Sequence, residues 1–399
     1  MKQKTVHSFK ITVNAINRQT SEIIDFSDTL ISFSGKENYL GNVFALYVLK
    51  FQISNEQLKF LSENDVNFSI SILRATNVLN QSNEDYDLND ITYDKETFND
   101  VLRPFNRPKI ENIKDKEYES DDDATPDQQK IIYTINCISI AALSYNNPII
   151  NGIYTDTTLK NVLVNIVSSV FKETLYFQDP DNTAIFPTIF IPPMNLVPAL
   201  EFLESGYEIY KSDFNMFIKS DHFYIYCINQ PERNYEHRFD INIVNMTQNT
   251  NDELYQYFQL DENDNGDIYY KNTPVVSDTH DIVANVVGNN MIAYSYDNNF
   301  NLVTRNYNTE SDYNKVRYYW NNKKTKVAEL GTLEQFTNTC TISLANIDDS
   351  LFEPSTRIQI NGSTLDFANG IYSLVLKIFT YKSDNFRTYT NNVVLQLAK

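Results

Sequence analysis

The sequence predicts a mostly β protein in which two small antiparallel β-barrels are joined by a helix-containing α/β middle domain. The chain of 399 residues contains 27 Tyr and 25 Phe but only 9 Gly, and aromatic residues favour strands. Apolar and polar residues alternate near both ends of the chain, whereas the clearest helical periodicity lies in the middle. The length allows two or three domains. We place them at residues 1–148, 149–230 and 231–399.

The first domain is predicted from four strand-like runs. Phe9, Ile11 and Val13 alternate with polar residues as in a half-buried strand, and the later runs alternate or are apolar on both faces. The four runs span residues 9–13, 42–53, 66–73 and 130–143. Four or more strands in one block suggest an antiparallel barrel or sandwich.

A polar insertion is predicted at residues 80–128. It contains 15 acidic and 6 basic residues, which leaves a net charge of −9. Long insertions in compact domains are usually functional or mobile. We interpret this one as a solvated loop, with the alternative of a docking arm for a neighbouring subunit anchored by Phe98, Leu102 and Phe105.

The middle domain begins with the clearest helix of the chain, predicted over residues 157–172 with a threonine as its N-cap. Its apolar side chains recur at i, i+3, i+4, i+7, i+8 and i+11. They are Leu159, Val162, Leu163, Ile166, Val167 and Val170.

A compact unit of strand, helix and hairpin follows at residues 186–228. Its apolar strand is expected to stop at Pro192 and Pro193, which cannot donate to a ladder. Asn195 is the expected cap of a short helix, and Gly206 the residue just beyond its end. The runs FNMFIK and FYIYCI then predict a hairpin, and nothing in the unit indicates catalysis.

Short strand-like runs return from residue 235 and fill the third domain. The final 30 residues carry the strongest local signal, because SLVLKIFTY and FRTYTNNVVLQLA alternate on either side of the polar turn KSDN. Gly362 is expected to supply a positive φ in an earlier turn. Because both ends of the chain resemble small barrels, we infer a duplication of architecture rather than of sequence.

The chain is acidic, with 33 basic and 52 acidic residues and a net charge of −19. Specific binding to nucleic acid is therefore not expected, since it needs clustered Lys and Arg. The charge suits solubility alone, or an acidic wall that repels phosphates and lets DNA pass.

Cysteine usage and segment hydropathy indicate a protein made in a reducing cytoplasm. Cys137, Cys227 and Cys340 lie in strand-like runs without CxxC spacing, so we expect buried thiols rather than a disulfide framework or a zinc site. The N-terminus lacks the apolar stretch of a signal peptide, and no long apolar run predicts a membrane span.

No catalytic, cofactor-binding or metal-binding residue is predicted. Residues 261–272 match the first half of a calcium loop, but Asn272 stands where a bidentate Glu is needed, so a simple turn is favoured. The Tyr-rich runs at 207–210 and 318–322 suit a core or an interface better than a carbohydrate-stacking surface. The histidines lack the spacing of a ligand set and are interpreted as surface or structural residues. They are His7, His222, His237 and His280.

The central domain and the last 30 residues resemble a known family. The order "strand, IPP, short helix, SGYEIYKSDFNMFI, FYIY", followed by a closing "GIYSLVLKIF…FRTYTNNVVLQL" hairpin, resembles the tail or baseplate hub proteins of tailed bacteriophages. That family is related to the hubs of contractile injection systems and type VI secretion spikes. The resemblance covers residues 149–228 and 370–397 best.

The resemblance implies a structural, non-enzymatic virion protein. Such hubs are homotrimers whose two tail-tube-like barrels per chain adapt a hexameric tail tube to a trimeric central spike or fibre. They line the DNA passage and contact the tail tube, tape measure and other baseplate proteins. The chain would be made in the bacterial host cytoplasm and reside in the virion tail. Two alternatives stay open: a receptor-binding or distal tail protein, and a hub-associated cell-wall hydrolase.

Overall fold

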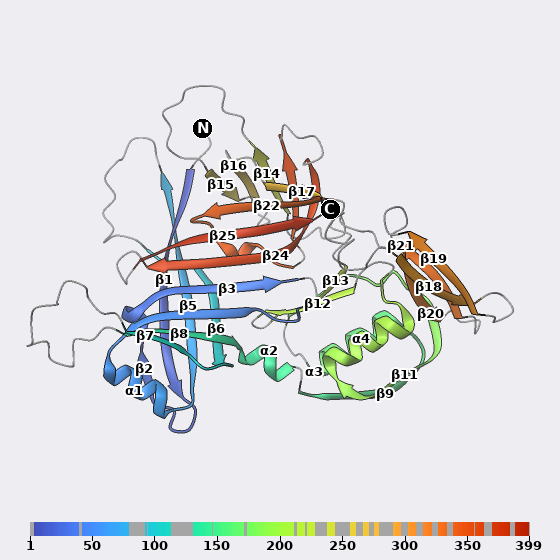
Figure 1. The fold of residues 1–399 in the computed structure, drawn as a ribbon, viewed down its shortest axis with the longest axis horizontal. Helices are drawn as coiled ribbons and strands as arrows, with labels where there is room; N and C mark the ends of the chain where they lie inside the picture. Colours follow the sequence, from blue (N-terminus) through green and yellow to red (C-terminus); the bar gives the residue numbers. More distant parts are fainter. Residues whose placement is uncertain are drawn as a thin grey trace, which may run out of the picture.

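The computed structural model describes residues 4–39, 42–79, 92–93, 95–112, 131–145, 147–170, 174–210, 214–219, 222–227, 238–243, 256–260, 266–270, 275–278, 290–296, 302–308, 314–320, 326–332, 338–354, 356–362, 369–383 and 388–398. The structure is mostly β, as predicted, with few helices among these residues. Blue N-terminal and red C-terminal strands lie side by side, and a green unit with two helices lies beside them (Figure 1). Within the described ranges, no helix is long and apolar enough to cross a membrane.

Eight antiparallel strands form a closed barrel. Hydrogen-bonded neighbours follow the order β24, β3, β4, β8, β6, β5, β1 and β25, and the pairing of β25 with β24 closes the ring. The strands are β1 (Lys4–Asn17), β3 (Leu30–Asn38), β4 (Leu46–Ile53), β5 (Val66–Leu79), β6 (Lys95–Pro104), β8 (Ile131–Ser139), β24 (Gly370–Ser383) and β25 (Tyr389–Ala398). Six strands thus come from the predicted first domain, and the terminal hairpin supplies the other two.

Aromatic side chains fill the barrel because strand residues point alternately inward and outward. Phe33 and Phe51 are completely buried, and the ring centroids of Phe33 and Phe379 lie 5.6 Å apart. Gly35 is paired with Phe379 across the two strands, and a Cβ added to Gly35 would come within 2.2 Å of that ring. The absence of a side chain at Gly35 therefore makes room for the Phe379 ring.

Short elements lie beside the barrel strands, and two of them extend the pairing, β2 on β1 and β7 on β8. Ser54 and Gln57 form a reciprocal capping box at the start of α1, which satisfies two backbone donors at the helix end. The short elements are β2 (Ile23–Asp25), the 3-10 helix η1 (Ser27–Thr29), α1 (Asn55–Glu63), β7 (Lys109–Asn112) and α2 (Ile140–Tyr145).

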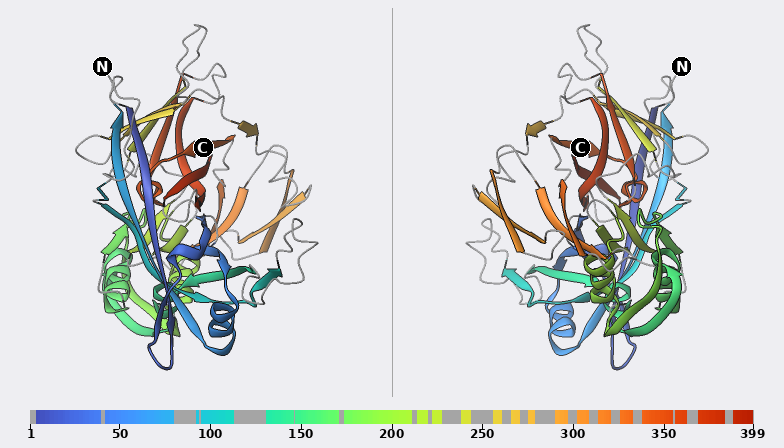
Figure 2. Two further views of the ribbon diagram at one scale, coloured as in Figure 1. Left: turned by 90° about the vertical axis from the view of Figure 1, so that its left-hand side faces the viewer. Right: turned by 90° about the vertical axis from the view of Figure 1, so that its right-hand side faces the viewer.

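A second group of strands extends from the same terminal hairpin. On one side β24 pairs with β23 and leads to β14, β16 and β15, and on the other β25 pairs with β22 and leads to β17. Two further hairpins, β18–β19 and β20–β21, form separate two-stranded sheets. In Figure 2 the red C-terminal strands lie between the blue N-terminal strands of the barrel and the orange hairpins. The strands are β14 (Arg238–Ile243), β15 (Gln256–Leu260), β16 (Gly266–Tyr270), β17 (Val275–Asp278), β18 (Asn290–Tyr296), β19 (Leu302–Asn308), β20 (Asn314–Trp320), β21 (Lys326–Thr332), β22 (Asn338–Ala345) and β23 (Arg357–Asn361).

The segment from 149 to 227 has a hydrophobic core of its own. The helices α3 and α4 pack on the ribbon of β9 and β11, and β12 and β13 form the predicted hairpin, with β10 added in parallel. The elements are β9 (Ile149–Thr158), α3 (Leu159–Val170), β10 (Thr174–Phe177), β11 (Ile185–Asn195), α4 (Leu196–Tyr207), β12 (Phe214–Lys219) and β13 (His222–Cys227).

The predicted helix at 157–172 is confirmed as α3, and Asn195 as the cap position of α4, but the strand end predicted at Pro192 and the helix end predicted before Gly206 are wrong. The strand β11 continues through both prolines to Asn195, because a register shift between Ile191 and Met194 accommodates them. Asn195 occupies the N-cap position of α4 without a side-chain hydrogen bond. Gly206 lies inside α4, and Glu208 is the C-cap residue with a φ of 55°.

Two predicted boundaries in the first domain are also corrected. The strand expected at 130–143 ends at Ser139, where α2 begins. The insertion at 80–128 is not one continuous loop, because residues 95–104 form the barrel strand β6 and residues 109–112 form β7. The alternation of β6 was hidden because one of its two buried positions is the charged residue Asp100, while the other is Leu102. Residues 92–93 and 105–108 are also described, and the rest of the insertion lies outside the described residues.

Candidate functional site

Two opposite charges face each other inside the barrel. Glu37 on β3 and Lys377 on β24 are partners in the cross-strand register, and both are completely buried. They are held there by alternation, since Lys377 has the same inward phase as Phe379, and Glu37 the same phase as Phe33. The Lys377 Nζ lies 3.0 Å from Glu37 Oε2.

Asp349 and two tyrosines complete this arrangement. Asp349 lies in the 3-10 helix η5 (Asp349–Leu351), and Lys377 Nζ donates to its carbonyl oxygen at 3.0 Å and lies 3.5 Å from its Oδ2. The hydroxyl of Tyr39 donates to Glu37, and that of Tyr381 donates to Asp349. Buried charges are tolerated only when such partners replace the lost water.

The hairpin β12–β13 brings a second lysine to the same place. Lys219 Nζ lies 3.9 Å from Glu37 Oε1, and the Tyr226 hydroxyl donates to the Tyr39 carbonyl at 3.3 Å. The backbone N–H of Ile218 also donates to the Val43 carbonyl at 2.6 Å. We call Glu37, Lys219, Asp349 and Lys377, with Tyr39 and Tyr381, the ion cluster. It joins the barrel, the terminal hairpin and the helix-containing unit.

The loop that carries Asp349 is fixed by a second buried pair. Asp348 Oδ2 lies 2.5 Å from Arg74 Nη1 of β5 and 3.6 Å from Lys95 Nζ of β6. Asn391 of β25 holds the loop from the other side, because its Oδ1 accepts from Ile347 N at 2.9 Å and its Nδ2 donates to Ile347 O at 2.5 Å. The loop therefore reaches both halves of the barrel.

Burial and neighbouring charge set the protonation of the ion cluster. Burial opposes ionisation of Glu37, but the charges of Lys219 and Lys377 outweigh it and bring the pKa of Glu37 below its usual value. Burial raises the pKa of Asp349 and lowers the pKa of Lys377. Outside the cluster, burial followed by the charge of Arg74 lowers the pKa of His7 from 6.5 to about 4. His7 is therefore neutral at pH 7.

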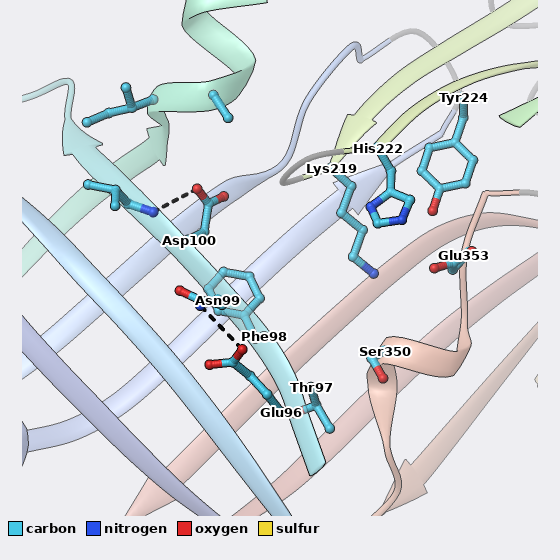
Figure 3. Close-up of a pocket in the computed structure, with 13 residues that line it drawn as sticks. Glu96, Thr97, Phe98, Asn99, Asp100, Lys219, His222, Tyr224, Ser350 and Glu353 are labelled. Carbon is cyan, nitrogen blue, oxygen red and sulfur yellow. Dashed lines mark hydrogen bonds between the residues drawn. The ribbon is translucent and has the colours of Figure 1, made fainter. Parts of the chain in front are cut away.

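A polar pocket of about 740 Å³ opens beside the ion cluster. Figure 3 shows Asp100 and Glu96 of β6 on one side, with Lys219, His222, Tyr224 and Glu353 on the other. Asp100 Oδ1 accepts hydrogen bonds from Ser139 Oγ at 3.0 Å and from Val101 N at 2.7 Å. Lys219 lines the pocket and also belongs to the ion cluster, because its Nζ lies 3.9 Å from Glu37 Oε1.

The ion cluster has the chemistry of a structural contact between parts of the fold. Its carboxylates and ammonium groups pair with one another across three regions of the chain, so separating any of these regions would leave a buried charge without a partner. Among the residues that the structure describes, no three His, Cys, Asp or Glu side chains are placed to hold a metal ion.

Several residues singled out in the sequence lie apart from this cluster. His7 is buried in β1, and His222 begins β13 at the pocket wall. Tyr210 is buried, and residues 318–320 lie in β20. His237, His280, Asn272 and residues 261–265 lie outside the described residues, while 266–270 form β16. Cys137, Cys227 and Cys340 are buried thiols, as predicted.

The sequence analysis missed the members of the ion cluster. A signal for two of them was present in the alternation of their strands. Glu37 follows Phe33 and Gly35 in the inward phase of β3, and Lys377 precedes Phe379 and Tyr381 in the inward phase of β24. Asp348 and Asp349 gave no comparable signal, because Asp-Asp-Ser after a strand is typical of an exposed turn.

A family model for the bacteriophage PBS1 gene 109 protein matches residues 2–398. The chain belongs to the bacteriophage PBS1 gene 109 protein family. The bacteriophage affiliation expected from the sequence is thereby confirmed. No curated protein sequence matches this gene 109 family chain.

Solved structures similar to this gene 109 family chain include proteins from several bacteria. The tail protein from Neisseria meningitidis MC58 is 8% identical with a TM-score of 0.47, and the match covers 98% of this chain and 96% of that one. The 43 kDa tail protein of prophage MuSo2 from Shewanella oneidensis is 8% identical with a TM-score of 0.47, covering 97% and 96%. The E. coli c3393 protein, a component of the type VI secretion system, is 10% identical with a TM-score of 0.41, covering 96% and 76%.

Proposed function

We propose that this chain is a structural subunit of a bacteriophage tail, and specifically a baseplate hub that adapts a hexameric tail tube to a trimeric central spike or fibre. The observation that carries the proposal is the terminal hairpin. β24 and β25 complete the eight-stranded barrel and also begin the second group of strands. One chain thus presents two β units that are rigidly coupled through shared strands.

This coupling suits a change of symmetry. Three copies of a chain with two β units would present six units to a hexameric tube, while the chains themselves keep threefold symmetry for a spike. Such an adaptor needs its two units held at a fixed angle. The continuous strands of the hairpin, and the ion cluster that anchors η5 and the helix-containing unit to the barrel, supply that rigidity.

The three predicted domains correspond to separate parts of this proposed adaptor. We propose that residues 1–148 with the terminal hairpin form the first ring unit, that 149–230 form an α/β spacer, and that the strands of 231–399 form the second ring unit. The family resemblance supports tail tube, spike or fibre, tape measure and other baseplate proteins as partners in the virion. The net charge of −19 supports an acidic bore along which DNA slides without binding.

The oligomeric state tests the hub role. Native mass spectrometry of the full chain is expected to give a species of three times 46.3 kDa. Electron microscopy with the tail tube protein of the same phage is expected to show one trimer capping each tube end. A hexamer, or a trimer that leaves tubes uncapped, contradicts the proposal.

A further inference from the structure

The ribbon formed by β9 and β11 has an exposed apolar outer face. Ile153 and Phe190 are cross-strand partners, and they are 68% and 51% exposed. Ile149 lies on the same face of β9 and is 68% exposed. Of the nine large apolar side chains exposed in the described part of the chain, these three lie on one face of a single two-stranded ribbon. This concentration marks an interaction surface rather than scattered surface residues.

The inner face of the ribbon is already occupied. Ile150, Ile189 and Ile191 are buried in the core that the ribbon shares with α3 and α4, and the helices lie along one side of β9 and β11 in Figure 1. The outer side chains therefore contribute nothing to this core. The helices α3 and α4 pack against the opposite face of the ribbon that carries them.

Features of β11 favour contact through the face rather than through the edge. Pro192 and Pro193 have no N–H group to offer an added strand. The Phe190 N–H already donates to the Tyr207 hydroxyl at 3.3 Å. A partner thus gains most by packing side chains over Ile153 and Phe190.

Charge indicates which partner fits this surface. Asp156 is the single charged residue in β9 and β11, although the whole chain carries a net charge of −19. Two copies of so acidic a chain repel each other across most approaches, and this repulsion is smallest where one of the two contacting surfaces is an uncharged apolar face. A basic partner would be drawn to acidic surface instead.

We propose that the outer face of the ribbon, formed by Ile149, Ile153 and Phe190, is a surface on which a second copy of this chain packs in the trimer. The trimeric copy number rests on the proposed function, whereas the location of the contact rests on the ribbon. In a cyclic trimer the contact is heterologous, so this face meets a different surface of the neighbouring copy.

The test compares full-length variants by native mass spectrometry over a dilution series. Ile153→Asp with Phe190→Asp is expected to weaken association at least about 100-fold. Ile153→Lys with Phe190→Lys lowers the net negative charge, and it should weaken association as strongly because the apolar contact is lost. Ile23→Asp is the matched control, since Ile23 is 63% exposed on β2, away from the ribbon. Near-UV circular dichroism establishes that each variant is folded.

Each outcome decides between the two proposals. A trimeric wild type with dissociated ribbon variants and an intact Ile23→Asp control supports the ribbon contact. A trimer that survives both ribbon pairs overturns the contact and leaves the hub role standing. A wild type that stays monomeric at every concentration overturns both and indicates a different protein as the occupant. Dissociation by the Asp pair alone also overturns the contact, because it would report charge repulsion only.

Discussion

At the scale of single residues, the ion cluster shows how a barrel can hold charge in its interior. Lys377 Nζ has three oxygen acceptors, and each carboxylate of the cluster also accepts from a tyrosine hydroxyl. The alternation that places Glu37 and Lys377 inside can be read from the sequence. Their pairing cannot, because it depends on the register between strands that are more than 300 residues apart.

Removing the central cation should destabilise the fold strongly. Lys377→Met leaves Glu37 and Asp349 buried without their closest counter-charge, which is expected to lower the free energy of unfolding by about 3–5 kcal/mol. Urea denaturation measures this change. Lys382→Met is the control, because Lys382 is exposed on the same strand.

The double variant Glu37→Gln with Lys377→Met should recover part of the loss, because it removes an unpaired buried charge. Equal denaturation midpoints for Lys377→Met and Lys382→Met would contradict the structural role of the cluster.

Acidification should destabilise the barrel through His7. The lowered pKa of His7, from 6.5 to about 4, means that the unfolded chain binds a proton in this interval while the folded chain does not. Stability is therefore lost as the pH falls from about 6.5 to about 4, by up to about 3 kcal/mol. The depressed pKa of Glu37 acts separately, because its contribution is complete above the unfolded value of 4.5 and is lost only below it.

Unfolding free energies measured in urea at pH 7 and pH 5 test the His7 contribution. His7→Gln should flatten the difference in unfolding free energy between the two pH values. An unchanged slope in His7→Gln would show that other groups carry the pH dependence.

At the scale of elements, local sequence predicted the parts with strong periodicity. The helix α3, the hairpin β12–β13, the hairpin β24–β25 and the positive φ of Gly362, 79°, all agree with the sequence. The failures have physical causes. A register shift in β11 accommodates its two prolines, and β6 was hidden because the charged residue Asp100 takes one of its buried positions.

Two glycines should respond in opposite ways to the same substitution. Gly35→Ala places a Cβ against the Phe379 ring inside the barrel, which is expected to cost about 1–3 kcal/mol through overpacking. Gly206→Ala meets no atom within 4 Å in α4, so it should be neutral or should stabilise by up to about 1 kcal/mol. Thermal and urea unfolding of both variants test this. A tolerated Gly35→Ala would mean that the Phe379 ring has room to move.

At the scale of the whole molecule, the sequence predicted β content but not how the ends of the chain combine. The first and last barrel strands meet where Phe9 pairs with Tyr389, and β24 lies between β3 and β25. The boundary expected at 148 separates six barrel strands from the two that complete them. Pairings of such long range leave no local pattern, so periodicity could not have revealed them.

Removing the terminal hairpin should open the barrel. A chain that ends at residue 369 lacks both closing strands, and the inward residues of β1 and β3 lose their partners. We expect loss of the near-UV circular dichroism signal and of cooperative unfolding. A peptide of residues 370–399 added in trans should restore both, and a peptide with Lys377→Glu should not. A cooperative fold in the truncated chain would contradict closure by the hairpin.

The position of β24 and β25 in the chain also has a consequence during synthesis. About 230 residues separate the end of β8 from the start of β24, so a ribosome needs roughly 10–50 s to supply the closing strands after the first six have emerged. The nascent barrel must wait with two open strand edges, β3 and β1, and is exposed to aggregation throughout that interval. Folding of the barrel is therefore completed only after β25 has left the ribosome, and the acidity of the chain helps to keep the unfinished barrel in solution.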